Sequence, residues 1–255
     1  MLLKEVNYLN DSDKTTLIKL RPRAHPILAS GVPLLDEYLL GGFRKDSLLH
    51  FFGEPGAGKT TFAMQIMANI MREGWKGIWV DSNAAFSLEK FAGIVGNTAF
   101  VKNLIVVQPK SFHQQTQILQ NVKLYLDHVG IIVVDAITYH YRSERFQEAS
   151  QGFFQELVDE QLGTLIGIGH LQKIPIIVIN YATIGGDGNR VPLVANGFQR
   201  VERYRFAFGN LEGGEDDPVK CLTIEFAPEK YSQNRTFTFE VSQKGILGFQ
   251  LLAKE

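Results

Sequence analysis

The stretch GEPGAGKT, residues 53–60, has the residue types and spacing of a phosphate-binding loop (P-loop). Glycines let the backbone bend around an anion so that successive N–H groups point at it. In the pattern G-x-x-x-x-G-K-T, the lysine is placed for the β- and γ-phosphates and the threonine hydroxyl for magnesium. The stretch therefore predicts a site for ATP and Mg²⁺. The predicted contacts come from Glu54, Pro55, Gly56, Ala57, Gly58, Lys59, Thr60 and Thr61.

A carboxylate that could complete the magnesium site ends the apolar run GIIVVD at Asp135. Taken alone, an aspartate after such a run is more often a plain strand boundary. Parallel strands, however, bring their carboxyl ends to the ligand crevice of a sheet, where an aspartate can hold magnesium. With the P-loop in the same chain, we predict that Thr60 and Asp135 hold Mg²⁺. Lys59 and Asp135 are the predicted catalytic residues.

The elements around these residues alternate between short apolar runs and helical patterns. Apolar residues recur at helical spacing from 59 to 72, and further helices are expected at 111–128 and 148–172. The apolar runs that read as strands lie at 47–53, 77–81, 104–109, 130–135 and 174–180. Four more strand-like runs follow without helices between them. This order predicts an α/β fold in which helices flank a mostly parallel twisted sheet, with a C-terminal antiparallel extension.

Composition and charge narrow the class of protein. The 255 residues carry a net charge of −1, so a nucleic-acid contact would need a local basic patch. One cysteine excludes an intrachain disulfide framework. No apolar run approaches the ~20 residues of a membrane span, and we expect a cytoplasmic protein without membrane partners. The segment KLRPRAHP suggests an N-terminal arm at 1–28 before an ATP-binding core at 29–255.

Several segments, in one order, resemble the RecA/RadA recombinase core and most of all its archaeal RadB-type paralogs. SGVPLLDEYLLGGF is similar to the family's entry segment, and LLHFFGEPGAGKTTFAMQ to its first strand, P-loop and helix. VDSNAAFSLEKF resembles the family's IDTEGTFRPERL, and IIVVDAITYHYRSERF its Walker B strand and following loop. FEVSQKGI resembles the last hairpin. The resemblance covers roughly residues 25–250 and implies a RecA-like P-loop NTPase core, without the family's N-terminal helix-hairpin-helix domain.

Three positions depart from the family's pattern. Asn83 occupies the position at which the family has the glutamate that activates water. An amide is not a base near neutral pH. Tyr181 follows Asn180 where the family has a phosphate-sensing glutamine. Lys90 replaces an arginine that packs on the adenine. The resemblance, taken together with these three departures, predicts that the protein binds ATP and hydrolyses it slowly. Glu54 is a less favoured candidate for the catalytic base.

The family contacts DNA with two loops, and their counterparts here are only partly suited to it. YHYRSERF interleaves aromatic residues with Arg142 and Arg145, which suits phosphates and stacked bases but equally a solvated helix entry. The glycine-rich TIGGDGNRVPLVANG offers Arg190 as its single arginine. These three arginines are the candidate contacts to single-stranded DNA.

Two functions remain open from the sequence. The first is an ATP-binding recombinase paralog in DNA recombination and repair, at most a weak DNA-dependent ATPase. Its partners would be single-stranded DNA, a RadA-type recombinase or another paralog, or copies of itself. The second is a KaiC-like nucleotide-gated interaction protein without DNA binding. The match of AAFSLEKF to the family favours the first.

Overall fold

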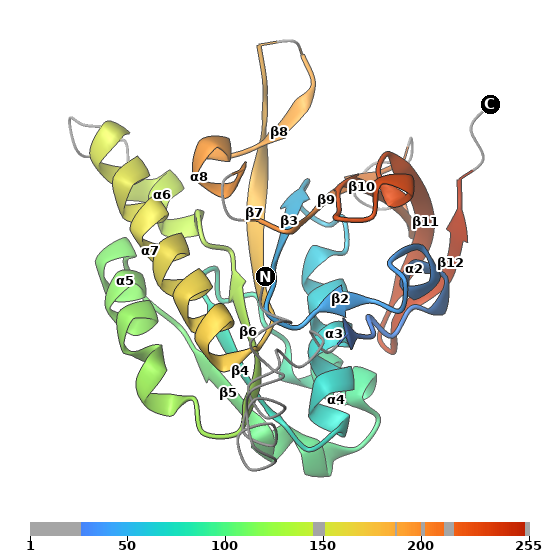
Figure 1. The fold of residues 1–255 in the computed structure, drawn as a ribbon, viewed down its shortest axis with the longest axis horizontal. Coiled ribbons are helices and arrows are strands. Elements are labelled where there is room, and N and C mark those ends of the chain that lie inside the picture. Colours follow the sequence, from blue (N-terminus) through green and yellow to red (C-terminus); the bar gives the residue numbers. More distant parts are fainter. Residues whose placement is uncertain (1–26, 145–150, 187, 200–201, 212–216, 253–255) are drawn as a thin grey trace, which may run out of the picture.

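The computed structural model describes residues 27–144, 151–186, 188–199, 202–211 and 217–252. In this part of the chain a ten-stranded sheet has the order β12-β11-β10-β9-β3-β7-β6-β4-β5, with β8 paired to β7 (Figure 1). The strands are β3 (Leu48–Gly53), β4 (Lys76–Asp81), β5 (Leu104–Val107), β6 (Val129–Asp135), β7 (Ile176–Ile184), β8 (Arg190–Pro192), β9 (Tyr204–Asn210), β10 (Val219–Phe226), β11 (Arg235–Ser242) and β12 (Gly245–Leu251). A small separate sheet pairs β1 (Ile27–Leu28) with β2 (Phe43–Arg44).

The sheet is parallel in its larger part and antiparallel towards the C-terminus. Adjacent strands are parallel to each other within the run β9-β3-β7-β6-β4-β5. Strands β10, β11 and β12 continue the sheet in antiparallel pairing from β9. The predicted α/β fold is confirmed, with one correction. Strand β9, the first of the four C-terminal runs, still pairs in parallel with β3, so the antiparallel C-terminal extension begins at β10.

Helices lie on both faces of the sheet (Figure 1). They are α2 (Pro33–Tyr38), α3 (Lys59–Arg72), α4 (Leu88–Val95), α5 (Phe112–Asn121), α6 (Tyr139–Glu144), α7 (Gln151–Gln172) and α8 (Ala195–Gln199), with short 3₁₀ turns at η2 (Thr98–Asn103), η3 (Val122–Tyr125) and η5 (Lys230–Ser232). Each helix layer has its own apolar core. Along β6, Ile131 and Val133 face the core that contains α3, whereas Ile132 and Val134 face the core that contains α5 and α7. Burial on both faces explains why this strand is apolar throughout.

Some predicted boundaries differ from the structure. Ser111 caps α5 as expected, since its hydroxyl accepts a hydrogen bond from the Gln114 N–H at 3.1 Å. The helix ends at Asn121, and not near residue 128, because η3 tightens the chain before it returns to β6. His128 takes a positive φ of 56° at that return. The predicted arm, residues 1–28, lies almost wholly outside the described residues, so its boundary stays a prediction.

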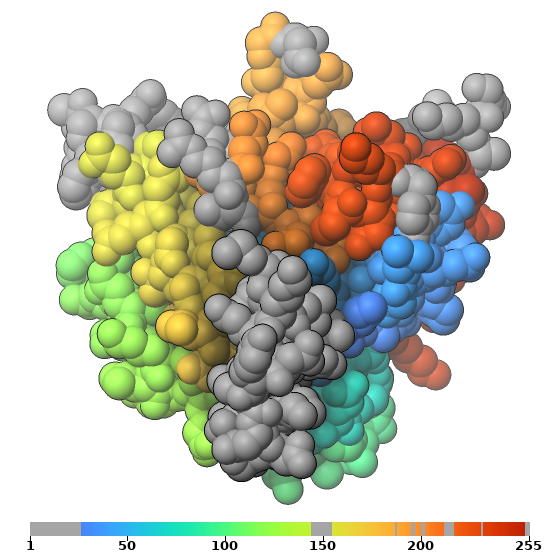
Figure 2. Space-filling model, viewed as in Figure 1, coloured from blue at the N-terminus to red at the C-terminus, as the bar shows by residue number. Residues whose placement is uncertain are grey.

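The hairpin of β7 and β8 stands out from the body of the molecule, as the space-filling view shows (Figure 2). It extends from the same end of β7 at which the P-loop follows β3, because Gly53 pairs with Tyr181. Part of the glycine-rich segment that corresponds to the family's second DNA-contacting loop is a strand, Arg190–Pro192. None of the helices in the described part of the chain has the length and apolar character to cross a bilayer.

Candidate nucleotide-binding site

The P-loop connects β3 directly to α3. Gly58 precedes the first residue of the helix with a φ of +88°, a conformation that favours glycine. A Cβ at Gly58 would lie 2.9 Å from side-chain atoms of Phe239 and Val241, on the C-terminal extension. Glycine is thus required here for both conformation and space. The turn leaves the N-terminus of α3, with its free N–H groups and positive dipole end, at the carboxyl edge of the sheet, where it suits an anion.

Lys59 lies folded against the start of the loop. Its side chain donates hydrogen bonds to the Gly53 carbonyl, at 2.9 Å, and to the Glu54 carbonyl. The residue is only 8% exposed. Burial lowers the pKa of Lys59 to about 8, and the carboxylates of Asp135 and Glu54 partly oppose this shift. A weakly solvated cation at the loop gains strongly from a phosphate partner.

Thr60 and Asp135, the residues predicted to hold Mg²⁺, contact each other. The Thr60 hydroxyl, in the first turn of α3, donates a 2.7 Å hydrogen bond to Asp135 Oδ2, at the end of β6. A hydroxyl and a carboxylate side by side are oxygen ligands of the kind that Mg²⁺ prefers, so the pair fits this ion. Asp135 is buried, and burial raises the pKa of its carboxyl to about 6 despite the hydrogen bond from Thr60 and the charge of Lys59.

We expect the change Asp135→Asn to stabilise the metal-free protein at neutral pH. The pKa of Asp135 is raised from 3.8 to about 6, so the folded state loses stability as pH rises through this window. An amide avoids that cost and still accepts from Thr60, which predicts a gain of about 2 kcal/mol in the free energy of unfolding. The gain should vanish near pH 4. Urea unfolding with EDTA at pH 4 and pH 7.5 measures it; a less stable variant at pH 7.5 contradicts the burial argument.

The loop after β4 holds Asn83 at the same edge of the sheet. The backbone N–H groups of Ala85 and Phe86 donate to the Asp81 carboxylate at 3.0 and 3.3 Å. Asn83 accepts a further hydrogen bond from Ala85 at 3.3 Å and is half-buried. Asp81 pairs with Asp135 across β4 and β6, which brings the loop next to the Thr60–Asp135 pair. The loss of a base at Asn83, and its effect on hydrolysis, stays a prediction.

The remaining predicted nucleotide contacts lie on the loop and on α4. Pro55 and Gly56 are exposed on the loop, while Ala57 and Thr61 are buried beneath it. Lys90 is in the first turn of α4, which packs against α3, and partial burial lowers its pKa. Its contact with adenine remains a prediction.

Glu54 of the P-loop contacts two strands of the sheet, β8 and β9. It forms an ion pair with Arg190 of β8, and the Asn210 N–H donates to Glu54 Oε2 at 2.9 Å.

Two of the three candidate DNA-binding arginines contact side chains at the P-loop, namely Tyr181, which pairs with Gly53, and Glu54. The Arg142 guanidinium carbon, on α6, lies 4.5 Å from the centroid of the Tyr181 ring. Arg190 pairs with Glu54 of the P-loop. Arg145 lies outside the described residues. The sequence did not predict these pairs, because each joins segments that only the strand order brings together.

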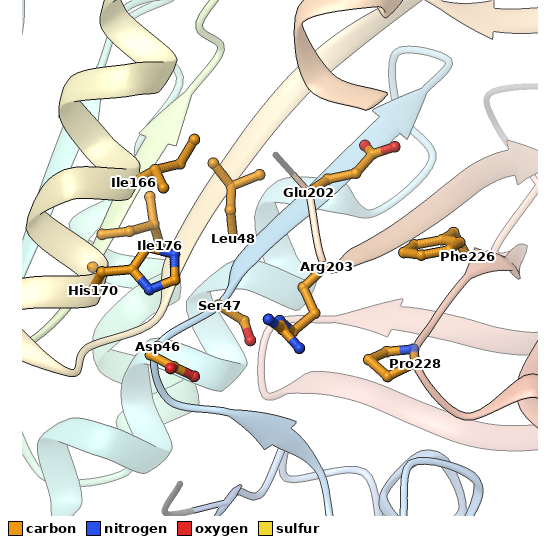
Figure 3. Close-up of a pocket in the computed structure, with 11 residues that line it drawn as sticks. Asp46, Ser47, Leu48, Ile166, His170, Ile176, Glu202, Arg203, Phe226 and Pro228 are labelled. Carbon is orange, nitrogen blue, oxygen red and sulfur yellow. The ribbon is translucent and has the colours of Figure 1, made fainter. Parts of the chain in front are cut away.

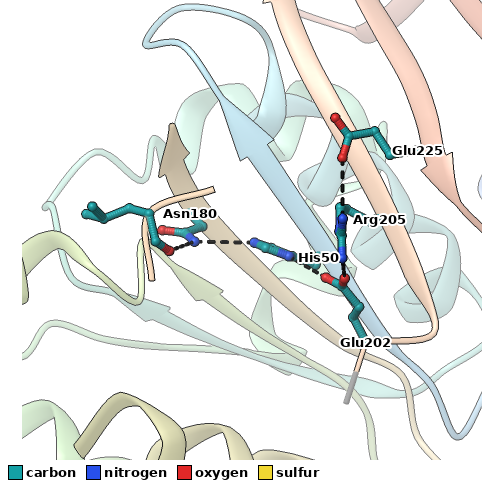
Figure 4. Close-up of polar contacts among 6 residues, drawn as sticks. His50, Asn180, Glu202, Arg205 and Glu225 are labelled. Atoms are coloured by element: carbon teal, nitrogen blue, oxygen red, sulfur yellow. Dashed lines mark hydrogen bonds and ion pairs between the residues drawn. The ribbon is translucent and has the colours of Figure 1, made fainter. Parts of the chain in front are cut away.

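A chain of polar side chains, buried from Asn180 to Glu202, links neighbouring strands of the sheet (Figure 4). Asn180, the last buried residue before Tyr181, accepts from Thr138 at 2.6 Å and approaches His50 Nε2 at 3.3 Å. His50 Nδ1 lies 2.6 Å from Glu202 Oε2. Arg205 donates to Glu202 Oε1 at 2.6 Å and continues the chain to Glu225. Sequence reasoning missed this chain; its visible signal was a histidine inside the apolar strand LLHFFG.

A cavity of about 430 Å³ lies at the other end of β3 (Figure 3). Asp46 and Ser47, just before β3, line it together with His170 of α7 and Phe226 of β10. Because the P-loop follows the opposite end of β3, this cavity is not part of the nucleotide site.

Comparison with known proteins matches the chain to one family. The family model of the RecA N-terminal domain matches residues 12–182. A protein named DNA repair and recombination protein RadB, from Methanococcoides burtonii, is 31% identical over 156 residues, which cover 60% of this chain and 69% of that protein. Its namesake from Pyrococcus horikoshii is 29% identical over 232 residues, with 86% and 93% covered.

The similarity to RadB proteins extends to the fold. A crystal structure of the RadB recombinase superimposes with a TM-score of 0.74 at 25% identity and covers 88% of this chain and 100% of that chain. This likeness confirms the RecA-like character of the predicted fold. It also confirms the resemblance to RadB-type proteins.

Proposed function

Because this chain belongs to the RecA family, as a RadB-like member of the RecA/RadA superfamily, we propose that it is an ATP-binding recombinase paralog in DNA recombination and repair. The observation that carries the proposal is the Thr60–Asp135 hydrogen bond of 2.7 Å below a P-loop whose lysine is already folded inward. Main-chain N–H groups of the loop and Lys59 bind the phosphates, and Thr60 and Asp135 hold Mg²⁺. When bound, the metal neutralises phosphate charge.

Slow hydrolysis is part of the proposal. Asn83 follows β4, whose last residue Asp81 pairs with Asp135, and the family resemblance gives its position to the residue that takes a proton from water. The Asn83 amide cannot accept that proton at neutral pH, although it can orient water by hydrogen bonding. The protein therefore retains ATP longer than it would as a processive motor.

The proposed protein partner is a RadA-type recombinase or another paralog, and the edge of the sheet supports it. Strand β5 ends the order of the described strands, and its four residues carry no charge. Beside it a cavity of about 380 Å³ is lined by side chains of β5, α5 and η3, among them Ile105, Val107 and Tyr125. An extended segment of the partner could pair with β5 and place an apolar side chain in this cavity.

The proposed nucleic-acid ligand is single-stranded DNA, bound weakly. Arg142 and Arg190 each contact the nucleotide site, so DNA phosphates must compete with Tyr181 and Glu54 for them. The same pairing favours the second candidate function, a nucleotide-gated interaction protein without DNA binding. Salt-dependent binding separates the two.

We expect labelled single-stranded DNA to bind with a slope of log K against log salt of about −1.4, as two phosphate contacts would give. Arg142→Gln should reduce the slope to about −0.7, while Lys123→Gln, an exposed cation on η3, should leave it unchanged. Fluorescence anisotropy between 50 and 300 mM salt, with and without ATP, measures the slope. No binding at the lowest salt, with ATP present, favours the second function.

A further inference from the structure

The two positions that depart from the family's hydrolytic residues contact each other. Asn83 follows β4, and Tyr181 lies on β7 opposite Gly53 of the P-loop. In the sheet, β6 lies between these two strands, and Asp135 is at its end. The polar contact between the Asn83 side chain and the Tyr181 phenol therefore spans the end of β6, close to Asp135. The two residues that differ from the family's pattern, Asn83 and Tyr181, are thus neighbours at the end of β6.

Arg142 lies over the face of the Tyr181 ring. The guanidinium carbon lies 4.5 Å from the ring centroid, within the range of a cation–π interaction. Arg142 is positioned by its backbone, since its N–H donates to the Thr138 carbonyl at 3.0 Å in the turn that follows Asp135. The Tyr181 carbonyl accepts from the Leu193 N–H at 2.9 Å and so fixes the backbone of the same residue.

Neither side chain of the contacting pair can take a proton from water. The Asn83 amide is no base, and burial raises the pKa of the Tyr181 phenol above its ordinary value of 10.0, which the contact with Asn83 only partly opposes. A neutral aromatic side chain, half-buried next to the P-loop, can instead keep water out.

We propose that the Tyr181 side chain, held by Arg142 over its ring and by Asn83 at its hydroxyl, shields the terminal phosphate of ATP from attacking water. Asn83 and Tyr181 then act as one pair, and Arg142 is a positioning residue that acts through the Tyr181 ring. This inference rests on the proposed function, because it needs ATP at the P-loop. If the missing base alone made hydrolysis slow, Asn83→Glu would raise the hydrolysis rate. If Tyr181 shields the phosphate, Asn83→Glu should raise the rate little while Tyr181 remains.

A double-mutant cycle tests the pair. Single-turnover hydrolysis is measured for Asn83→Glu, Tyr181→Ala and the double variant, and binding of a non-hydrolysable analogue is measured by calorimetry on each. We expect the double variant to exceed the product of the single effects by at least about fivefold. Arg142→Gln should raise the hydrolysis rate several-fold without changing analogue affinity more than about twofold. Arg142→Lys should partly restore the parent rate.

A second readout needs no nucleotide. In the nucleotide-free protein with ¹³C-labelled tyrosine, the ring signals of Tyr181, assigned with Tyr181→Phe, should shift in Arg142→Gln and in Asn83→Ala. They should not shift in Lys123→Gln, and Tyr125→Phe is the matched control for the assignment, since Tyr125 is 63% exposed.

The outcomes separate the two proposals. Absence of analogue binding by the parent protein overturns the proposed function, and the shielding role with it. Normal binding with single effects that multiply, or an Arg142→Gln variant with the parent's rate and the parent's Tyr181 signals, overturns the shielding role alone.

Discussion

Replacing Lys59 by methionine is expected to lower the affinity for Mg-ATP about 100-fold. The side chain is buried against the loop, and its ammonium group donates to the Gly53 and Glu54 carbonyls, so it is already placed for phosphate. A hydrogen bond to a charged group contributes about 1.5–3 kcal/mol, and the upper end of that range corresponds to the expected loss. Isothermal titration calorimetry with Mg-ATP measures it.

The same substitution should change the stability of the nucleotide-free protein little. Burial lowers the pKa of Lys59 to about 8, which shows that its charge is poorly solvated in the fold. Loss of that cost offsets the loss of its two hydrogen bonds. Lys123→Met, at an exposed position of η3, is the matched control and should keep full affinity. An unchanged affinity in Lys59→Met would exclude the P-loop as the phosphate site.

The second large effect concerns the buried polar chain. Glu202→Leu is expected to lower the free energy of unfolding by about 3 kcal/mol, because it leaves Arg205 and His50 without their shared partner. The Glu202 side chain is 1% exposed, whereas that of Glu225, which pairs with the same arginine at 3.7 Å, is 33% exposed. Glu225→Gln is therefore the matched control, with an expected cost below about 1 kcal/mol. Urea unfolding of both variants measures the difference.

The cost of Glu202→Leu in the free energy of unfolding should also depend on pH. Burial alone would raise the pKa of Glu202, but hydrogen bonds from His50 and Arg205 outweigh it and leave the pKa lowered. A lowered carboxyl pKa stabilises the fold above the unfolded value of 4.5, and this stabilisation is lost as pH falls through the folded pKa. The cost of Glu202→Leu should thus shrink in acid. A cost that is the same at pH 7 and pH 3.5 contradicts the ion-pair account.

Local features of the fold were predictable from the sequence because short-range physics decides them. The glycines of the P-loop, the apolar spacing of α3 and the cap at Ser111 each depend on residues a few positions apart. The Thr60–Asp135 pair also followed, since carboxyl ends of parallel strands meet at one edge.

The pairing partners of Arg142 and Arg190 could not be predicted from the sequence. Arg142 and Tyr181 are on separate elements, α6 and β7, and so are Arg190 on β8 and Glu54 on the P-loop. Such pairs depend on the strand order and on the β7–β8 hairpin, and neither leaves a periodic pattern in the sequence. The buried chain through His50 and Glu202 joins residues 152 positions apart for the same reason.

The central claim is that the chain binds ATP through the P-loop and hydrolyses it slowly. Its most direct test incubates the protein, in slight molar excess, with radiolabelled Mg-ATP and identifies the nucleotide that stays bound over time. We expect nearly all label to be bound and most of it to be ATP still after several minutes. Label that stays free in solution, or bound label that is ADP within seconds, would contradict it.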